Sequence, residues 1–218
     1  MKPAIFSLTV VLTILFAACK KDKPIEPIPT PPIIYPDYSQ LKVGNYWVYQ
    51  HYEVDSNGNS TALNVFDTCF VEKDTLINGN TYYKLFKPLY IPSLSYYLII
   101  RDSLHYTVTS SGEIIFSSED FTSIFSEKYQ FVSATDTLCL IITKMEEKDV
   151  IITTPAGNFI TSNSKNIYYM YPPWNFAGNL RIQNTRYAKN IGVVSETLHF
   201  FVSNPNYTER RLVSYHLN

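Results

Sequence analysis

The fold is decided by the stretch LKVGNYWVYQHYEV, residues 41–54, which is followed by the turn-forming residues DSNGN at positions 55–59. Aromatic and β-branched residues fit a pleated, half-buried surface, whereas clusters of Asp, Asn, Ser and Gly mark turns. The stretch therefore predicts a β-strand that ends in a hairpin. In the returning segment, residues 63–71, apolar side chains occur on both faces, which predicts a strand at least partly covered on both sides.

Segments of the same kind follow up to the C-terminus. A second hairpin is predicted at Asn78-Gly79, because both residues tolerate positive φ. Further strands are predicted over residues 81–86, 96–101, 104–108, 129–133, 137–143, 150–154, 159–162, 166–171, 180–187, 193–202 and 209–216. Strands this closely spaced, with at most one or two short helices, predict a mainly β fold: a curved antiparallel sheet, as an open half-barrel or a sandwich.

Three segments depart from the strand pattern. A helix is predicted over residues 118–128, where Phe121, Ile124 and Phe125 stand at i, i+3 and i+4 behind a serine that could cap the first turn. Residues 146–149 are charged and predict a solvated turn. Residues 171–179 predict a loop, since adjacent prolines remove two backbone donors that a central strand would need.

The N-terminus is typical of an export signal. Lys2 precedes an apolar run of 13 residues, 4–16, which is too short for a hydrocarbon core of about 30 Å that needs about 20 residues. Small Ala17 and Ala18 then precede Cys19. This order resembles the signal of bacterial lipoproteins, and the resemblance implies a signal peptide over residues 1–18 and acyl chains on Cys19. An ordinary secretory signal and an uncut anchor are the alternatives.

The resemblance also bears on location. In many Gram-negative bacteria Asp after the lipidated cysteine retains a lipoprotein in the inner membrane, and this chain has Lys20 there. The resemblance therefore implies an outer-membrane lipoprotein, with the periplasmic or surface face left open. Two or three acyl chains such as palmitate, at ~0.8 kcal/mol per buried CH₂, would hold the chain on that membrane.

A proline-rich segment follows the cysteine. Six prolines fall between residues 23 and 37, a density that disfavours helix and sheet and favours extended polyproline II. Such a tether could hold a domain up to about 55 Å from the lipid; a ligand for an aromatic groove is the alternative. The predicted organisation is a signal peptide (1–18), a lipidated Cys with its tether (19–38) and a single antiparallel β domain (39–218).

Composition excludes one class of partner. Beyond residue 18 the chain has 17 Lys and Arg against 19 Asp and Glu, with no basic stripe, so nucleic acid is not an expected partner. The 180 residues from Ser39 onward suffice for one core. Cys69 and Cys139 fall in strand-like segments. In an exported chain they can either form a disulfide or remain two buried free thiols, and both alternatives stay open.

Four sequence pieces resemble those of many uncharacterised Gram-negative lipoproteins. They are L-x-x-GNYW-x-Y at 41–49, DT-x-ING-x-x-YYK at 74–84, TPAG-x-F at 154–159 and YA-x-x-IG-x-V at 187–194. The resemblance spans most of residues 41–200 and implies a strongly curved antiparallel sheet, similar to half-barrel carriers of the LolA type. It implies no activity.

No catalytic or cofactor motif is found. The nucleophile elbow, HExxH, phosphate-binding glycine loop, EF-hand and paired CxxC patterns are absent. The four histidines, at positions 51, 105, 199 and 216, lie in separate segments without the spacing of metal ligands. We therefore expect no catalytic residue, no metal and no cofactor, and a protein that is not an enzyme.

Three aromatic residues are candidates for ligand binding: Trp47 in the first strand, and Trp174 and Phe176 in the proline-rich loop. Exposed rings can stack on sugars or cover an apolar cavity, but large aromatics are more often buried. The expected function is that of a non-catalytic, lipid-anchored envelope protein that binds or scaffolds an envelope protein. A half-barrel carrier or sensor of an apolar ligand such as a lipid is the first alternative, and glycan binding the second.

Overall fold

The structure is a computed structural model that describes residues 33–89, 95–198 and 203–218. The predicted signal peptide, Cys19 and the tether as far as residue 32 lie outside these residues. The chain divides after Ile33 into two units. All strands described below lie in the second unit, Ile34–Asn218. Among the described residues there is no helix long and apolar enough to cross a membrane.

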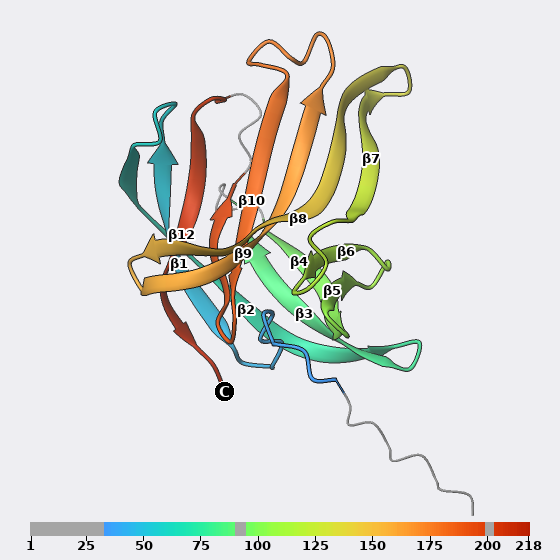
Figure 1. The fold of residues 1–218 in the computed structure, drawn as a ribbon, viewed down its shortest axis with the longest axis vertical. Coiled ribbons are helices and arrows are strands. Elements are labelled where there is room, and N and C mark those ends of the chain that lie inside the picture. The colour runs from blue at the N-terminus through green and yellow to red at the C-terminus, as the bar shows by residue number, and fades with distance from the viewer. Residues whose placement is uncertain (1–32, 90–94, 199–202) are drawn as a thin grey trace, which may run out of the picture. The chain divides into compact units, whose positions relative to one another are not determined.

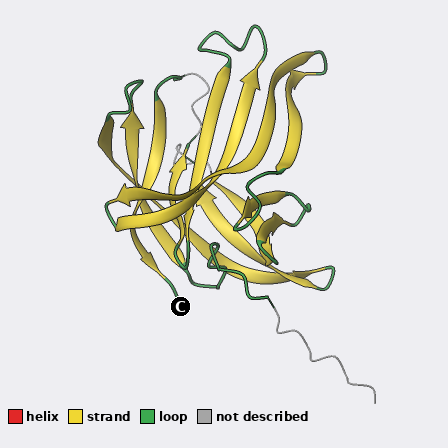
Figure 2. Ribbon diagram, in the orientation of Figure 1, coloured by secondary structure: helices red, strands yellow, loops and turns green. Residues whose placement is uncertain are grey.

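The described residues form twelve β-strands and no helix (Figure 2). The strands are β1 (Tyr46–Val54), β2 (Ser60–Ile77), β3 (Asn80–Pro88), β4 (Ser95–Ser103), β5 (Tyr106–Thr109), β6 (Ile114–Ser117), β7 (Ile124–Ser133), β8 (Asp136–Thr154), β9 (Gly157–Met170), β10 (Leu180–Ala188), β11 (Gly192–Thr197) and β12 (Tyr207–His216). The prediction of a mainly β fold is confirmed.

All twelve strands belong to one antiparallel sheet, in the order β6-β5-β4-β3-β2-β1-β12-β11-β10-β9-β8-β7. Each half of the chain is a run of consecutive strands, and the halves join where β1 pairs with β12. The predicted hairpins at residues 55–59, between β1 and β2, and at Asn78-Gly79, between β2 and β3, are both present. At the second of them, Asn78 and Gly79 both have positive φ, as the tight turn between β2 and β3 requires.

The sheet curves until its two edges approach each other (Figure 1). The edge strand β6 contacts β7, β8 and β9. Ser164 Oγ on β9 donates a hydrogen bond of 2.7 Å to the carbonyl oxygen of Ile115 on β6. Phe116 on β6 also packs against Met145 and Tyr187 of the other half. The sheet is thus barrel-shaped and nearly closed, so the expectation of a curved sheet is confirmed.

The predicted helix over residues 118–128 is wrong. Ser117 Oγ accepts hydrogen bonds from the backbone N–H groups of Glu119 and Asp120, and Asp120 Oδ1 accepts those of Thr122 and Ser123. These local bonds favour turns over helix. From Ile124 onward the backbone pairs with β8 instead.

The predicted turn at residues 146–149 is also wrong. These residues lie inside β8, where a bulge shifts the register with β9 between Glu146 and Val150. Glu147 and Asp149 have positive φ, which absorbs the extra residues while pairing continues on both sides. As a result β8 and β9 are single long strands, each of which the sequence pattern divided into two. Residues 171–179 form the predicted loop between β9 and β10.

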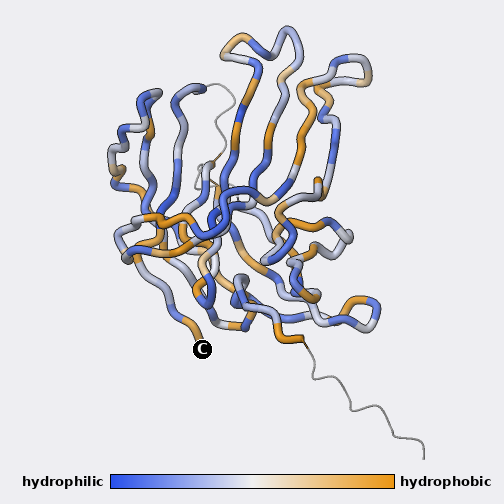
Figure 3. Tube along the Cα trace, viewed as in Figure 1, coloured by the Kyte–Doolittle hydropathy of each residue, from blue (hydrophilic) through white to orange (hydrophobic). Residues whose placement is uncertain are grey.

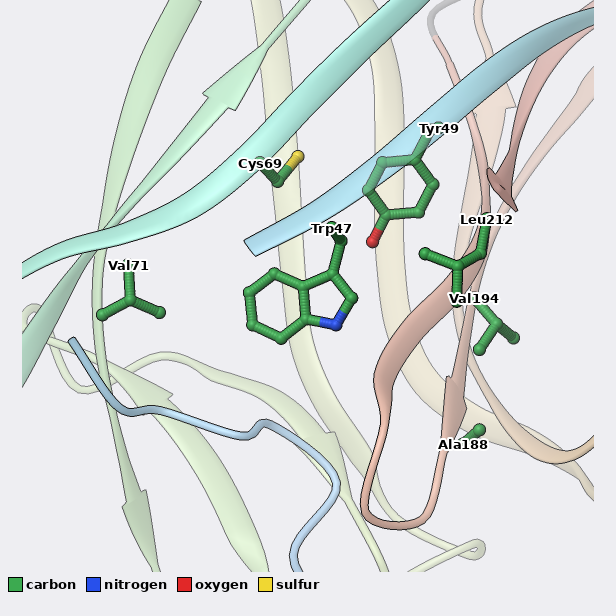
Figure 4. Close-up of a cluster of buried hydrophobic side chains, with 7 residues drawn as sticks. All are labelled: Trp47, Tyr49, Cys69, Val71, Ala188, Val194 and Leu212. Carbon is green, nitrogen blue, oxygen red and sulfur yellow. The ribbon is translucent and has the colours of Figure 1, made fainter. Parts of the chain in front are cut away.

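Hydrophobic residues occur along strands of both halves of the sheet rather than in one segment (Figure 3). The largest cluster of buried hydrophobic side chains joins the first strands to the last (Figure 4). It consists of Trp47, Tyr49, Cys69, Val71, Ala188, Val194 and Leu212. The largest part of the core therefore lies where the two halves of the sheet meet, and two smaller clusters lie around Phe116 and around Cys139.

Candidate functional site

A half-open cavity of about 550 Å³, called the main cavity below, lies between β7–β10 on one side and β3, β4 and β6 on the other. Because successive side chains of a strand point to opposite faces, alternate residues of each strand reach it. Ser126, Thr143, Asn166 and Gln183 come from β7, β8, β9 and β10 in turn. Leu98 and Ile115 come from β4 and β6 on the other side. The volume falls within the range of about 300–1,000 Å³ typical of small-molecule sites.

One wall of the cavity is polar. Ser126 Oγ donates to Thr143 Oγ1 (3.1 Å), Thr143 Oγ1 donates to Asn166 Oδ1 (2.8 Å), and Asn166 Nδ2 donates to Gln183 Oε1 (3.3 Å). These residues are directly opposite one another in the pairing of β7, β8, β9 and β10. Gln183 Nε2 then donates to the carbonyl oxygen of Thr197 on β11. We call the residues Ser126, Thr143, Asn166 and Gln183 the polar row.

The facing wall is apolar. It is formed by Leu89, Tyr96, Leu98 and Ile115, from β4, β6 and the residue that follows β3. Tyr187 and Tyr168 add rings from the side of the polar row. Burial raises the pKa of the Tyr168 hydroxyl to about 12, so it stays protonated and donates to Gln183 Oε1 at 2.8 Å. Hydrogen-bonding groups thus predominate on one side of the cavity, which also carries Ile141, and apolar side chains on the other, which also carries Lys87 and Glu113.

A buried ion pair forms the floor of the cavity. Lys87 Nζ on β3 lies 2.7 Å from Glu196 Oε1 on β11, and each side chain is only 9% exposed. Both residues also line a second, smaller cavity of about 40 Å³ beside the core residues Trp47 and Cys69. The pair therefore separates the main cavity from the core.

The floor belongs to a larger buried network. Arg210 Nη2 and Nε bind Glu196 Oε2, while Arg210 Nη1 lies 3.2 Å from Asp67 Oδ2. His51 Nε2 contacts the same Asp67 oxygen at 2.7 Å. The side chains come from β1, β2, β3, β11 and β12, so the network ties both halves of the sheet together.

The network keeps Glu196 and Lys87 charged although they are buried. Burial alone would raise the pKa of the Glu196 carboxyl, but the charges and hydrogen bonds of Arg210 and Lys87 lower it to about 2. Burial alone would likewise lower the pKa of the Lys87 ammonium, yet Glu196 raises it above the ordinary value. Glu196 thus contacts two cationic side chains, Lys87 and Arg210, and such pairing is the condition for burying charge.

A second ion pair lies in the upper part of the cavity. Lys128 Nζ on β7 is 2.7 Å from Glu113 Oε1, and both residues line the cavity. This pair is more exposed than the floor, with Lys128 53% and Glu113 33% accessible. Within the part of the chain that the structure describes, every charged side chain lining the cavity therefore has an oppositely charged partner.

Sequence reasoning missed this site, although a signal for it exists. Lys87 and Glu196 lie in strand-like runs that are mostly apolar or hydroxylic, whereas Arg210 stands between Glu209 and Arg211. A buried strand tolerates such a charge only when an opposite charge from another strand reaches it. The sequence shows the charged residues but not which of them meet.

The three predicted binding residues are not brought into one site. Trp47 is 4% exposed in the largest core cluster, and its Nε1 donates to the carbonyl oxygen of Ile191 at 2.6 Å. Trp174 packs against a separate cluster, and its Nε1 donates to Asp136 Oδ1. Phe176 is 68% exposed on the loop between β9 and β10. None of the three lines the main cavity.

The two described cysteines are buried free thiols, so the alternative of a disulfide between Cys69 and Cys139 is not realised. They belong to different core clusters, one on β2 and the other on β8. Burial raises the pKa of the Cys69 thiol to about 11, which keeps it protonated at neutral pH. Cys69 therefore behaves as a small hydrophobic residue rather than a nucleophile.

The described segments contain no group of three or more His, Cys, Asp and Glu side chains placed to hold a metal ion. The described histidines lie apart: His51 is in the buried network, His105 pairs with Ser117, and His216 stacks on Tyr46. The fourth, His199, lies outside the described residues.

Comparisons with known proteins give only remote likenesses. No family model matches the sequence, and no curated protein matches it. Among solved structures the chain is similar to a candidate exported protein with a YmcC-like fold from Bacteroides fragilis, at 13% identity and a TM-score of 0.48, covering 83% of this chain and 99% of the other. It is also similar to a candidate lipoprotein from Parabacteroides distasonis, at 13% identity and a TM-score of 0.44, covering 84% and 100%. Likeness at this level carries no inference about function.

Proposed function

We propose that the protein is a non-catalytic binding protein of the cell envelope, held on the outer membrane by acyl chains on Cys19, and that it binds a small molecule in its main cavity. The observation that carries the proposal is the cavity of about 550 Å³ with one polar and one apolar wall. A concave site with a few convergent polar groups and perturbed pKa values is the usual form of a small-molecule site.

The absence of catalysis is part of the proposal and rests on how the charged groups are held. Glu196 and Lys87 at the cavity floor neutralise each other, and neither has a pKa near neutrality. A general acid or base works best when its pKa is close to the operating pH. The floor is therefore suited to fixing the shape and polarity of the site rather than to transferring protons.

Replacing Cys19 by serine is expected to abolish lipidation. The thiol would accept the diacylglycerol, and the export signal before it is otherwise intact. Cells fed a radiolabelled fatty acid should label the full chain but not the Cys19→Ser variant, which should leave the membrane fraction. Cys69→Ser and Cys139→Ser variants serve as controls and should keep the label. Equal labelling of the Cys19→Ser variant would contradict the proposed anchor.

Filling the cavity should block binding. Phenylalanine at Ser126 on β7 would project into the cavity, whereas phenylalanine at the neighbouring Glu127, which is exposed on the other face of β7, would not. We expect the mature chain to bind the neutral fluorescent probe N-phenyl-1-naphthylamine saturably. The Ser126→Phe variant should bind it at least tenfold more weakly, and Glu127→Phe should match the parent.

This measurement can also overturn the proposal. Probe binding that changes equally in both variants would contradict the proposal, and so would a parent that binds neither this probe nor the sugars and laurate tested below. Circular dichroism and thermal melting of the two variants distinguish a folding defect from a blocked cavity.

A second candidate function is a carrier of an apolar ligand such as a lipid acyl chain, which the resemblance to LolA-type half-barrels implies. The apolar wall of Leu89, Tyr96, Leu98 and Ile115 favours it. Native mass spectrometry of the protein extracted from its own membranes distinguishes the candidates, since a carrier should retain a lipid mass that is lost in the Ser126→Phe variant.

A further inference from the structure

Resting on the proposed function, we infer that the ligand of the main cavity is a neutral, hydroxyl-rich ring compound: a mono- or disaccharide rather than an acyl chain or a charged metabolite. The inference draws on three properties of the cavity lining: its balanced charge, its mixture of donors and acceptors, and its division into two unlike walls.

The charges of the lining favour a neutral ligand. The two cations, Lys87 and Lys128, each lie 2.7 Å from a carboxylate, that of Glu196 and Glu113 respectively. A ligand with a net charge would enter a site that has no counter-ion to spare among the described residues. Burying an unpaired charge is far more costly than burying a hydrogen-bonded neutral group, so the site discriminates against ions.

The polar row offers both donors and acceptors. A side-chain amide has two N–H donors and an acceptor oxygen, and a hydroxyl both donates and accepts. Gln183 uses one N–H in its hydrogen bond to Thr197, which leaves a second for a ligand, whereas the amide of Asn166 bonds both Gln183 and Tyr168. Thr185 adds a further hydroxyl to this wall. Groups of this kind match ligand hydroxyls, which are themselves both donors and acceptors.

The division of the walls selects a ligand with two unlike sides. A sugar ring carries hydroxyls around its edge and C–H groups on its faces, so it can bind the polar row while a face lies against Tyr96 and Leu98. An acyl chain would displace water from the polar row, and it has no groups that could replace the hydrogen bonds made by that water. Polar groups left without partners weaken binding strongly, so the polar row disfavours an acyl chain.

The test compares two asparagines on the same strand. Asn166→Leu removes the centre of the polar row, whereas Asn158→Leu makes the same chemical change at the exposed start of β9, where Asn158 Oδ1 accepts a hydrogen bond from Thr153 Oγ1. Calorimetric titration of the mature chain would use maltose and N-acetylglucosamine as neutral sugars, glucuronate as a charged sugar and laurate as an acyl chain.

We expect at least one neutral sugar to bind, with affinity about tenfold or more weaker in Asn166→Leu and unchanged in Asn158→Leu. Glucuronate and laurate should bind at least tenfold more weakly than the neutral sugar. Because Asn166→Leu could disturb folding, Ser126→Ala provides a milder change at the edge of the row and should weaken sugar binding several-fold without altering the thermal melting curve.

Two failures can be told apart. If laurate binds, is lost in Ser126→Phe and is kept in Asn166→Leu, the sugar inference is overturned while the cavity remains a binding site. If neither the sugars, laurate nor N-phenyl-1-naphthylamine binds, the inference and the proposed function fall together. Stronger binding of glucuronate than of the neutral sugars would overturn the argument from charge balance.

Discussion

Replacing Arg210 by methionine is expected to lower the free energy of unfolding by about 3–5 kcal/mol. Arg210 is 1% exposed and contacts both Glu196 and Asp67, so its removal leaves two buried carboxylates with much of their compensating charge lost. Methionine keeps most of the side-chain volume, which makes the loss of charge the main change. Equilibrium urea unfolding of the mature chain measures the effect.

The neighbouring Arg211 gives a matched control. Its side chain is 22% exposed and pairs with Glu209, and the Arg211→Met variant should lose less than about 1 kcal/mol. Similar losses in the two variants would contradict the assignment of Arg210 as the centre of a buried network.

Acid gives a second readout of the same network. The pKa of Glu196 in the folded protein, about 2, lies below the ordinary value of 4.5, so its ionised form stabilises the fold. That contribution is complete above about pH 4.5 and is lost as the pH falls towards 2. A Glu196→Gln variant should therefore lose less stability than the parent over this interval; an identical loss would contradict the lowered pKa.

Replacing Trp47 by alanine is expected to cost about 3–5 kcal/mol of unfolding free energy. The indole is buried in the largest core cluster and donates to the backbone of Ile191, across the junction of the two halves (Figure 4). Gly192 lies so close that a Cβ there would be 3.0 Å from Trp47 Nε1, so the ring has no room to move in that direction. Urea unfolding again provides the measurement.

Tyr46 is the matched control for Trp47. It is the preceding residue of β1, 40% exposed, and its ring stacks on His216. Because it points to the other face of the strand, Tyr46→Ala should cost about 1 kcal/mol or less. A Trp47→Ala variant as stable as Tyr46→Ala would show that the indole is not a core residue.

The fold was largely predictable from local pattern. The aromatic and β-branched residues of 41–54 and the Asn78-Gly79 turn are signals that depend only on neighbours in sequence. The structure has strand β1 over Tyr46–Val54 and the predicted turn at Asn78-Gly79. The errors occur where side chains alter a local pattern. Ser117 and Asp120 turn a helical spacing into successive turns, and the bulge at residues 146–149 carries β8 through a charged run.

The candidate site was less predictable than the fold. Trp47 was a candidate binding residue because of its large aromatic ring, but in the structure it is packed in the core. The residues of the cavity floor, Lys87 and Glu196, are 109 positions apart in sequence and meet only because the sheet curves. Such a pairing depends on strand order and register, which no local pattern in a single sequence contains.

The pairing of β1 with β12 also determines when the protein can fold. Strand β1 pairs with β2 on one side and with β12, Tyr207–His216, on the other. Arg210 belongs to β12. Contacts between such distant parts of a chain form slowly. A chain emerging N-terminus first therefore keeps one edge of β1 unpaired until β12 has been synthesised, so the two halves of the sheet cannot join before that strand is available.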